Sequence, residues 1–159
     1  MNKLLIAAAA LSAAAVALPA AAQAQVYVGA GYTHYDTDGA GDLGAITGRV
    51  GYQFTPHFAI EGEAGFGVKD DGPFELNHSV GAYAVGTLPL SQRFDLHGRV
   101  GYQTTEIGTP LGDGDSDGVA YGVGGTFNVN ERFGVRADVT RLEGDLDTDT
   151  VSVGGVMRF

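Results

Sequence analysis

The sequence contains no cysteine, which excludes a disulfide framework and a thiol nucleophile. Basic residues are few, because nine Lys and Arg stand against nineteen Asp and Glu, for a net charge of −10. A chain this acidic is a poor partner for nucleic acid, whose phosphates attract cations. Beyond residue 24, no apolar run is long enough for a transmembrane helix. The sequence therefore excludes a nucleic-acid-binding protein and a helical membrane protein.

The first 24 residues differ from the rest of the chain. Lys3 is followed by an apolar stretch over residues 4–18, then by Pro19 and the tripeptide Ala-Gln-Ala. This order is typical of a signal peptide and predicts cleavage before Gln25 and export from the cytoplasm. An uncleaved anchor is the alternative, but the segment is mostly alanine and carries a cleavage pattern. Cleavage leaves 159 − 24 = 135 residues, which fit one domain over residues 25–159 with a charge of 8 − 19 = −11.

Twenty-six glycines, many β-branched residues and strict alternation of apolar and polar positions predict strands. Apart from Pro19, the prolines fall in candidate turns, loops or near a strand end, where a strand tolerates them. The pattern divides the chain into eight strands, over residues 26–36, 44–55, 58–69, 77–90, 94–105, 118–129, 133–142 and 150–159. Each has about ten residues, the length of a transmembrane β-strand.

The connections alternate in kind. Three are tight, Thr-Pro-His, Ser-Gln-Arg and Asn-Glu-Arg, and each is followed directly by a phenylalanine. The other four are longer and acidic, with the sequences TDGAGDL, DDGPFEL, EIGTPLGDGDSD and EGDLDTD. Short turns at one end and long polar loops at the other indicate an up-and-down antiparallel sheet. This asymmetry, with an even number of strands, is typical of an outer-membrane β-barrel.

Two observations place the apolar face of these strands outward, toward lipid. Aromatic residues gather near the ends of the strands, as expected for belts at the two membrane interfaces. The chain also stops on an aromatic, Phe159. A closed barrel would satisfy every backbone group, as lipid requires. The predicted fold is therefore an all-β, eight-stranded antiparallel up-and-down transmembrane β-barrel; a secreted soluble barrel with an apolar interior is the alternative.

The chain resembles the small eight-stranded outer-membrane proteins of Gram-negative bacteria, which include the OmpA transmembrane domain and the OmpX/Ail group. The resemblance rests on the signal, the units PHFAIEGEAGFG and ERFGVRADVTR, the repeated GRVGYQ and the terminal VGGVMRF. It implies an outer-membrane location and lipid and lipopolysaccharide as surroundings, and we expect a monomer. It also implies that Phe159 belongs to a signal read by the barrel-assembly machinery. The chain lacks the peptidoglycan-binding domain of full-length OmpA, so the resemblance does not extend to a cell-wall tether.

The predicted interior carries four charges of each sign. The inward-facing charged residues are Arg49, Arg99, Arg136, Arg158, Glu61, Glu63, Asp95 and Asp138. Counting across the first tight turn puts Phe54 opposite Phe58, and therefore Arg49 opposite Glu63. Because unpaired buried charge is costly, we interpret this set as a plug of salt bridges. Inward glycines are expected to leave some room for water, so a narrow pore is the alternative.

The hexapeptide GRVGYQ supplies two of these arginines. In one copy the chain runs toward its tight turn, and in the other it runs away from its turn, so the spacing brings Arg49 and Arg99 to about the same height. We therefore predict a charged layer in the middle of the barrel, with Glu63 and Asp138 as the partners of the arginines.

The acidic loops suggest metal binding. Asp113, Asp115 and Asp117 match the opening D-x-D-x-D-G of a calcium loop. The twelfth position is Gly124 rather than a bidentate glutamate, so a solvated acidic loop is the preferred interpretation. Fourteen of the nineteen acids lie in or beside the four long loops. We expect no resident cofactor, but a weak affinity for divalent cations that could bridge to lipopolysaccharide phosphates.

The four histidines do not indicate an enzyme. Some small barrels modify lipid A, and the deacylase type uses a His-x-Ser arrangement, which is not found at His34, His57, His78 or His97. The predicted function is therefore a non-enzymatic, structural or surface-interacting outer-membrane barrel that acts through its acidic loops. A small porin-like channel for ions or small solutes is the second hypothesis, and a lipid-modifying enzyme is the third.

Overall fold

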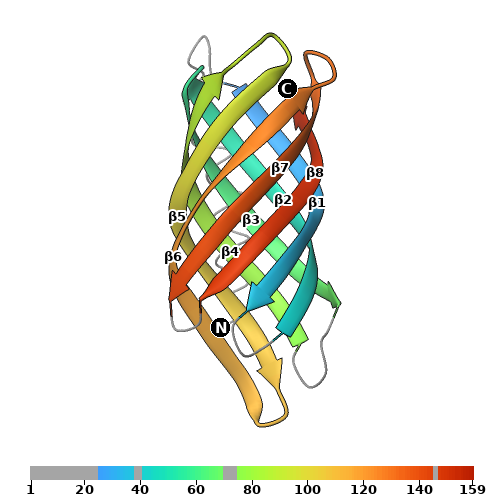
Figure 1. The fold of residues 1–159 in the computed structure, drawn as a ribbon, viewed down its shortest axis with the longest axis vertical. Helices are drawn as coiled ribbons and strands as arrows, with labels where there is room; N and C mark the ends of the chain where they lie inside the picture. Colours follow the sequence, from blue (N-terminus) through green and yellow to red (C-terminus); the bar gives the residue numbers. More distant parts are fainter. Residues whose placement is uncertain (1–24, 38–40, 70–74, 145–146) are drawn as a thin grey trace.

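A computed structural model describes residues 25–37, 41–69, 75–144 and 147–159. These residues form a closed barrel in which each strand pairs with its sequence neighbours and β8 pairs with β1 (Figure 1). The strands are β1 (Gln25–Thr37), β2 (Gly41–Thr55), β3 (Phe58–Lys69), β4 (Glu75–Pro89), β5 (Phe94–Thr109), β6 (Gly112–Asn128), β7 (Phe133–Gly144) and β8 (Thr148–Arg158). All pairings are antiparallel, which confirms the predicted fold class. The predicted signal peptide, residues 1–24, lies outside the described residues.

Burial along the strands is inverted relative to a soluble protein. In β7 the apolar Val135 and Val139 are half exposed, whereas Arg136, Asp138 and Thr140, at the alternate positions, are buried. The same alternation runs around the barrel, so valine and phenylalanine cover the outside while charged, hydroxyl and several tyrosine side chains fill the inside. This distribution suits an apolar solvent around the barrel. None of the described residues forms a helix long and apolar enough to cross a membrane.

The connection between β5 and β6 differs from the sequence prediction. Residues 106–117 were expected to form a long loop, but β5 continues to Thr109 and β6 begins at Gly112. Only Pro110 and Leu111 make the turn, and the hairpin projects beyond the other strands (Figure 1). The two strands satisfy each other's backbone groups from Thr104↔Asp117 to Thr109↔Gly112. Pairing across a hairpin therefore overrides the poor strand propensity of a Gly- and Asp-rich sequence.

At the turn between β2 and β3, one cross-strand pairing differs from the pairing predicted from the sequence. Arg49 does lie opposite Glu63, and the register continues to Gln53↔Ala59. A bulge then follows, so that Thr55, not Phe54, is the partner of Phe58. The extra residue is absorbed at the end of the strands and leaves the interior register unchanged.

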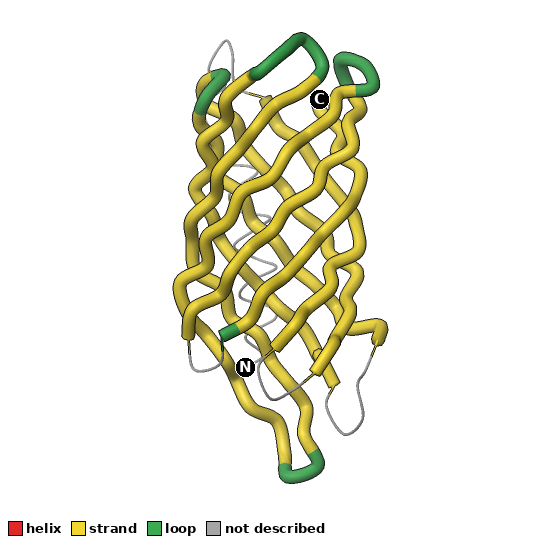
Figure 2. The backbone as a smooth tube through the Cα atoms, viewed as in Figure 1, coloured by secondary structure: helices red, strands yellow, loops and turns green. Residues whose placement is uncertain are grey.

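The three short turns share one hydrogen-bonding scheme. The side-chain oxygens of Thr55, Ser91 and Asn130 each accept hydrogen bonds from the backbone N–H groups two and three residues later, at 2.8–3.2 Å. Short polar side chains of this kind stabilise turns by satisfying backbone donors. Figure 2 shows the three turns gathered at one end of the barrel, with the tip of the β5–β6 hairpin at the other.

Candidate functional site: the charged interior

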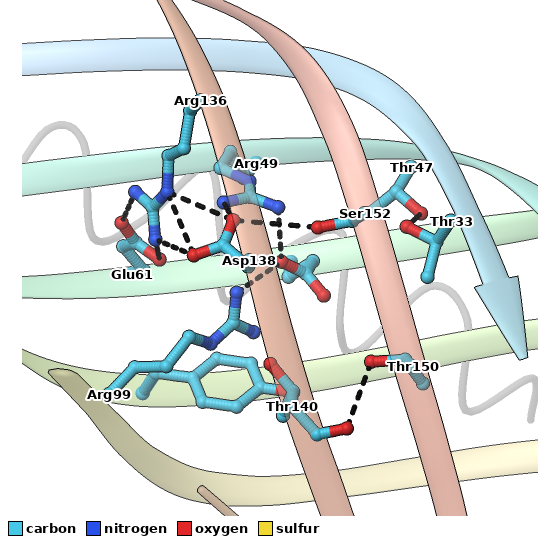
Figure 3. A network of polar contacts seen from close by, with 12 residues as sticks. Thr33, Thr47, Arg49, Glu61, Arg99, Arg136, Asp138, Thr140, Thr150 and Ser152 are labelled. Atoms are coloured by element: carbon cyan, nitrogen blue, oxygen red, sulfur yellow. Dashed lines mark hydrogen bonds and ion pairs between the residues drawn. The ribbon is translucent and has the colours of Figure 1, made fainter. Parts of the chain in front are cut away.

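Arg136 on β7 stands at the centre of the interior network. Its guanidinium binds both oxygens of Glu61, through Nη1 and through Nη2 at 3.3 Å. Its Nε also contacts Asp138, at 3.0 and 3.1 Å from the two carboxylate oxygens. Arg136 and Asp138 are two residues apart on one strand and share its inner face, while Glu61 reaches them from β3 (Figure 3). Multidentate contacts of this kind fix the planar guanidinium in position.

The two arginines of the repeated GRVGYQ converge on one carboxylate. Arg49 Nη2 lies 3.1 Å and Arg99 Nη1 lies 3.0 Å from Oε2 of Glu63. Arg49 also binds Asp138 Oδ2 through Nη1 at 2.8 Å (Figure 3). Residues from β2, β3, β5 and β7 are thereby connected across the interior. The three arginines and the three acids that they contact balance in formal charge.

Tyrosine and histidine side chains complete the coordination of these charges. The Tyr27 hydroxyl donates to Glu61 at 2.5 Å, and His97 Nε2 lies 2.5 Å from Asp138 Oδ1. The Arg99 guanidinium stacks on the ring of Tyr83, 3.6 Å from its centroid, a favourable cation–π geometry. Among the described residues, Arg99 Nε is one of two buried side-chain polar atoms without a hydrogen-bond partner.

The remaining predicted interior charges lie apart from this network. Arg158 and Asp95 sit at the end with the short turns, with Arg158 Nη2 3.7 Å from Asp95 Oδ2. Asn128 bridges them: it donates to Asp95 at 2.8 Å and accepts from Arg158 at 2.5 Å. Both charged side chains are partly exposed, so this is a second, more solvated polar cluster.

The inward glycines do not leave empty space. A Cβ on Gly51 would lie 2.0 Å from Cζ of Tyr27, and one on Gly29 would lie 2.9 Å from Cγ of Arg49. A Cβ on Gly124 would lie 2.6 Å from both Asp138 and His97. The expectation that these glycines make room for water is therefore wrong at these positions, because large side chains from neighbouring strands occupy the room.

Cavities lie on both sides of the charged layer. On the short-turn side a cavity of about 250 Å³ is bounded by Tyr27, His97, Arg136 and the Asp95–Arg158 pair. Beyond the layer, a cavity of about 10 Å³ is bounded by Thr33, Thr47, Arg49, Arg136 and Ser152. Hydroxyl groups line the interior toward the loops, as in the Thr33–Thr47 contact at 2.7 Å and the Tyr35–Ser79 contact at 3.1 Å.

The sequence-predicted metal candidates do not converge. Asp113, Asp115 and Asp117 occupy alternate positions of β6 and are all exposed on its outer face. Alternate residues of a strand are roughly 7 Å apart, so the three carboxylates form a row along the hairpin. Asp117 accepts a hydrogen bond from Tyr102. Among the described residues, no group of three or more His, Asp or Glu side chains is arranged to hold a metal ion.

Phe159, the predicted assembly signal, lies at the outer edge of the barrel. Its side chain is exposed, and its backbone N–H donates to Val26 O at 3.0 Å, which extends the β8–β1 pairing to the last residue.

Sequence reasoning missed the interior tyrosines. Tyr27 shares the inner face of β1 with Gly29 and Gly31, so its direction could have been inferred from the alternation. Tyr83 could not be placed in this way, because Ala and Gly occupy both faces of β4 around it. His97 also lies in the interior, and its hydrogen-bond partner is Asp138 on β7.

The closed eight-stranded barrel, apolar outside and charged inside, defines the class of small outer-membrane barrels. The chain belongs to the outer membrane protein beta-barrel domain family, whose model matches residues 4–159. No curated protein matches the sequence.

Solved structures with the same fold include three barrels from two organisms. The N-terminal barrel of OprF from Pseudomonas aeruginosa has a TM-score of 0.66 at 16% identity, covering 85% of this chain and 97% of that one. OprG from P. aeruginosa has a TM-score of 0.62 at 14% identity, covering 86% and 95%. Ail of Yersinia pestis, in complex with the heparin analogue sucrose octasulfate, has a TM-score of 0.60 at 18% identity, covering 86% and 99%. At these identities the likeness concerns the fold.

Proposed function

We propose that the protein is a non-enzymatic outer-membrane barrel, exported through a cleaved signal peptide, whose interior is closed and whose acidic loop end supports structural or surface interactions. The observation that carries the closed interior is the network that joins Arg49, Arg99 and Arg136 to Glu61, Glu63 and Asp138. An eight-stranded barrel is just wide enough for its own side chains to fill. Separating one of these pairs would leave an uncompensated buried charge, so the closed arrangement is favoured.

Planar-bilayer recording tests this proposal. The folded wild-type protein is expected to give no steady single-channel steps, because the charged layer obstructs the path between the two cavities. Steady steps from the wild type would overturn the closed-interior proposal. Heat-modifiable gel mobility of the same sample confirms that the protein tested is folded.

A small channel for ions or small solutes is the second candidate function. One observation favours it: the cavities on the two sides of the charged layer share Arg136 and Val156 as lining residues. Displacement of the Arg136 side chain would bring them into contact. If the charged layer closes a channel, Arg49→Ala should produce a leak that the wild type lacks, because the substitution removes a contact to both Glu63 and Asp138. Equal, negligible conductance of both proteins would leave the closed barrel as the supported function.

The loop end supports a surface role for cationic partners. Asp36 is the cross-strand partner of both Asp42 and Asp149, so three carboxylates follow one another across β8, β1 and β2. Like charges placed directly opposite repel each other, and Arg141, 3.6 Å from Asp149, offsets only part of this repulsion, so a cation is expected to be attracted to the row but held weakly. Ail has been crystallised with a sulfated ligand, but the acidity of this chain's loop end favours cations, including divalent ions that bridge to lipopolysaccharide phosphates.

Calcium titration of the folded barrel tests this surface role. We expect weak, saturable binding that Asp36→Asn reduces, because that substitution removes the middle carboxylate of the row. Asp95→Asn, at the opposite end, serves as the control and should leave binding unchanged. Binding that is identical in the wild type and in Asp36→Asn would count against the role of this row.

A further inference from the structure

The three short turns carry a feature that the loop-end function does not use. Their third residues are His57, Arg93 and Arg132, all basic and all exposed. The end of the barrel with the short turns is the periplasmic end in outer-membrane barrels. Basic side chains therefore recur at one structural position of the periplasmic rim, while the acids of the chain concentrate at the loops.

The backbone holds this third residue in the same way in each turn. The carbonyl of His57 accepts from Thr87 N at 2.8 Å, and that of Arg93 accepts from Asn128 N at 2.6 Å. The carbonyl of Arg132 accepts from Arg158 N at 2.7 Å. Each basic residue is thus tied to the neighbouring hairpin, or to the last strand, and its height on the rim is fixed. The repetition indicates a defined position rather than a loose loop.

Arg93 and Arg132 are also distinguished by their lack of ion-pair partners. All seven arginines of the chain lie in the part that the structure describes. The five others form ion pairs with acids; they are Arg49, Arg99, Arg136, Arg141 and Arg158. Within the described residues, neither Arg93 nor Arg132 forms one, even though Glu131 directly precedes Arg132.

The position of the two arginines relative to the membrane follows from their neighbours. Phe94 and Phe133 come directly after them and face outward, exposed, at the end of the apolar surface. Consecutive Cα atoms are about 3.8 Å apart, so the Cα of each arginine lies one residue beyond that of an interfacial aromatic. A long arginine side chain at this depth reaches the level of lipid headgroups.

We propose that Arg93 and Arg132 bind the phosphate groups of anionic phospholipids in the periplasmic leaflet, with His57 at the equivalent position of the first turn. An arginine guanidinium and a phosphate form bidentate, charge-assisted hydrogen bonds. The acidic loop end has the opposite charge and is unsuited to such lipids. The inference goes beyond the proposed function, because it concerns the other end of the barrel.

The adjoining phenylalanines favour lipid over the carboxylates of peptidoglycan. These turns keep each arginine within one residue of the apolar surface, at the level of the lipid headgroups. Both arginines flank the β5–β6 hairpin, since the Arg93 carbonyl binds Asn128 at the end of β6 and Arg132 precedes β7. One face of the barrel therefore carries two unpaired cations at headgroup depth.

Lipid co-purification tests the proposal. The mature barrel is folded into phosphatidylcholine vesicles that contain a minority of phosphatidylglycerol, extracted in mild detergent, and analysed for bound lipid. We expect the wild type to retain phosphatidylglycerol at about fivefold its share in the vesicle, from the affinity of a surface arginine for an anionic leaflet. The double variant Arg93→Gln/Arg132→Gln should lose this enrichment, and high salt should weaken it in the wild type.

The matched control is Arg141→Gln, which removes one exposed arginine at the loop end that is already paired with Asp147 and Asp149. It should leave the enrichment unchanged. Equal enrichment in the wild type and in the double variant would overturn the proposal, and so would loss of enrichment in Arg141→Gln. Binding of the wild type to purified peptidoglycan that is lost in the double variant, with no lipid enrichment, would assign the two arginines to the cell wall instead. Heat-modifiable mobility verifies folding of every variant.

Discussion

At the scale of single residues, the interior of this barrel combines pairs of opposite charge with glycines that make room for them. Glu61 accepts from Arg136 and from Tyr27, and Tyr27 in turn lies over Gly51. A side chain on the glycine would displace the tyrosine, and loss of the arginine would remove two hydrogen bonds to the carboxylate. Charge pairing and close packing therefore depend on each other in the same few residues.

Arg136→Ala is expected to lower the free energy of unfolding by about 3–5 kcal/mol, because it leaves Glu61 buried without its principal partner. Urea titration of the folded barrel in vesicles measures the change. The matched control is Arg141→Ala on the outer face of the same strand, whose ion pairs are exposed and should contribute less than about 1 kcal/mol. Similar losses in both variants would contradict a stabilising interior network.

Gly51→Ala is expected to destabilise the barrel by about 1–3 kcal/mol, because the new Cβ would overlap the ring of Tyr27. Gly48→Ala is the matched control on the outer face of the same strand, where nothing lies within 4 Å of an added Cβ. It should be neutral or stabilising by up to about 1 kcal/mol. In a Tyr27→Val background, Gly51→Ala should cost much less, and an unchanged cost would refute the packing explanation.

At the scale of elements, the repeated unit is the short turn. Thr55, Ser91 and Asn130 differ chemically, yet each side-chain oxygen accepts from the same two backbone N–H groups. The fourth residue of every unit is an outward phenylalanine. The turns therefore reverse the chain and anchor the start of the next strand in the interface in one step.

Ser91→Ala removes the acceptor of two backbone donors and should lower the free energy of unfolding by about 1 kcal/mol. Ser91→Asn should restore most of it, because Asn130 performs the same role in the third turn. Urea titrations of the three proteins compare the two outcomes. If Asn at position 91 were as destabilising as Ala, the side-chain acceptor would not be what stabilises this turn.

At the scale of the whole molecule, closure is the dominant feature. β1 and β8 pair from Tyr27↔Arg158 to Thr37↔Thr148, so within the described residues the sheet has no free edge along that seam. The start of β1 and the end of β8 lie side by side, as the hydrogen bond from Phe159 N to Val26 O shows. In a closed sheet every strand has two partners. Strand pairing alone therefore does not dictate between which two strands the chain begins and ends.

A circular permutant tests this view. A copy of the Asn-Glu-Arg turn would join Phe159 to Gln25, and the chain would be opened at the fully exposed Leu111 in the β5–β6 turn. We expect it to fold in vitro into detergent or vesicles, with heat-modifiable gel mobility. In cells it should assemble poorly if Phe159 acts as the terminal assembly signal. Efficient assembly in cells would refute that role. Failure to fold in vitro would show that the barrel does depend on where the chain begins and ends.

The number of strands, their order and the face that most of them present follow from the sequence alone; β4, with Ala and Gly on both faces, is an exception. Alternation of apolar and polar residues with a period of two identifies the strands and their outward faces. The short-turn sequences place the strand starts at Phe58, Phe94 and Phe133. The sequence also determined that Arg49 lies opposite Glu63, because the register across a short turn is fixed by counting. The extent of β5 and β6 beyond the barrel was not predictable, since Gly and Asp show no strand propensity there.

Contacts between interior groups on strands that are not neighbours could be read only from the closed barrel. Asp138 is 89 residues from Arg49 and 41 residues from His97 in the chain, and closure of the sheet brings all three together. The two copies of GRVGYQ share one acceptor, Glu63. Arg49 reaches it from the neighbouring strand β2, whereas Arg99 reaches it from β5, which does not pair with β3. Local patterns fix pairing between neighbouring strands, whereas contacts across the interior depend on the curvature of the closed barrel and on side-chain length.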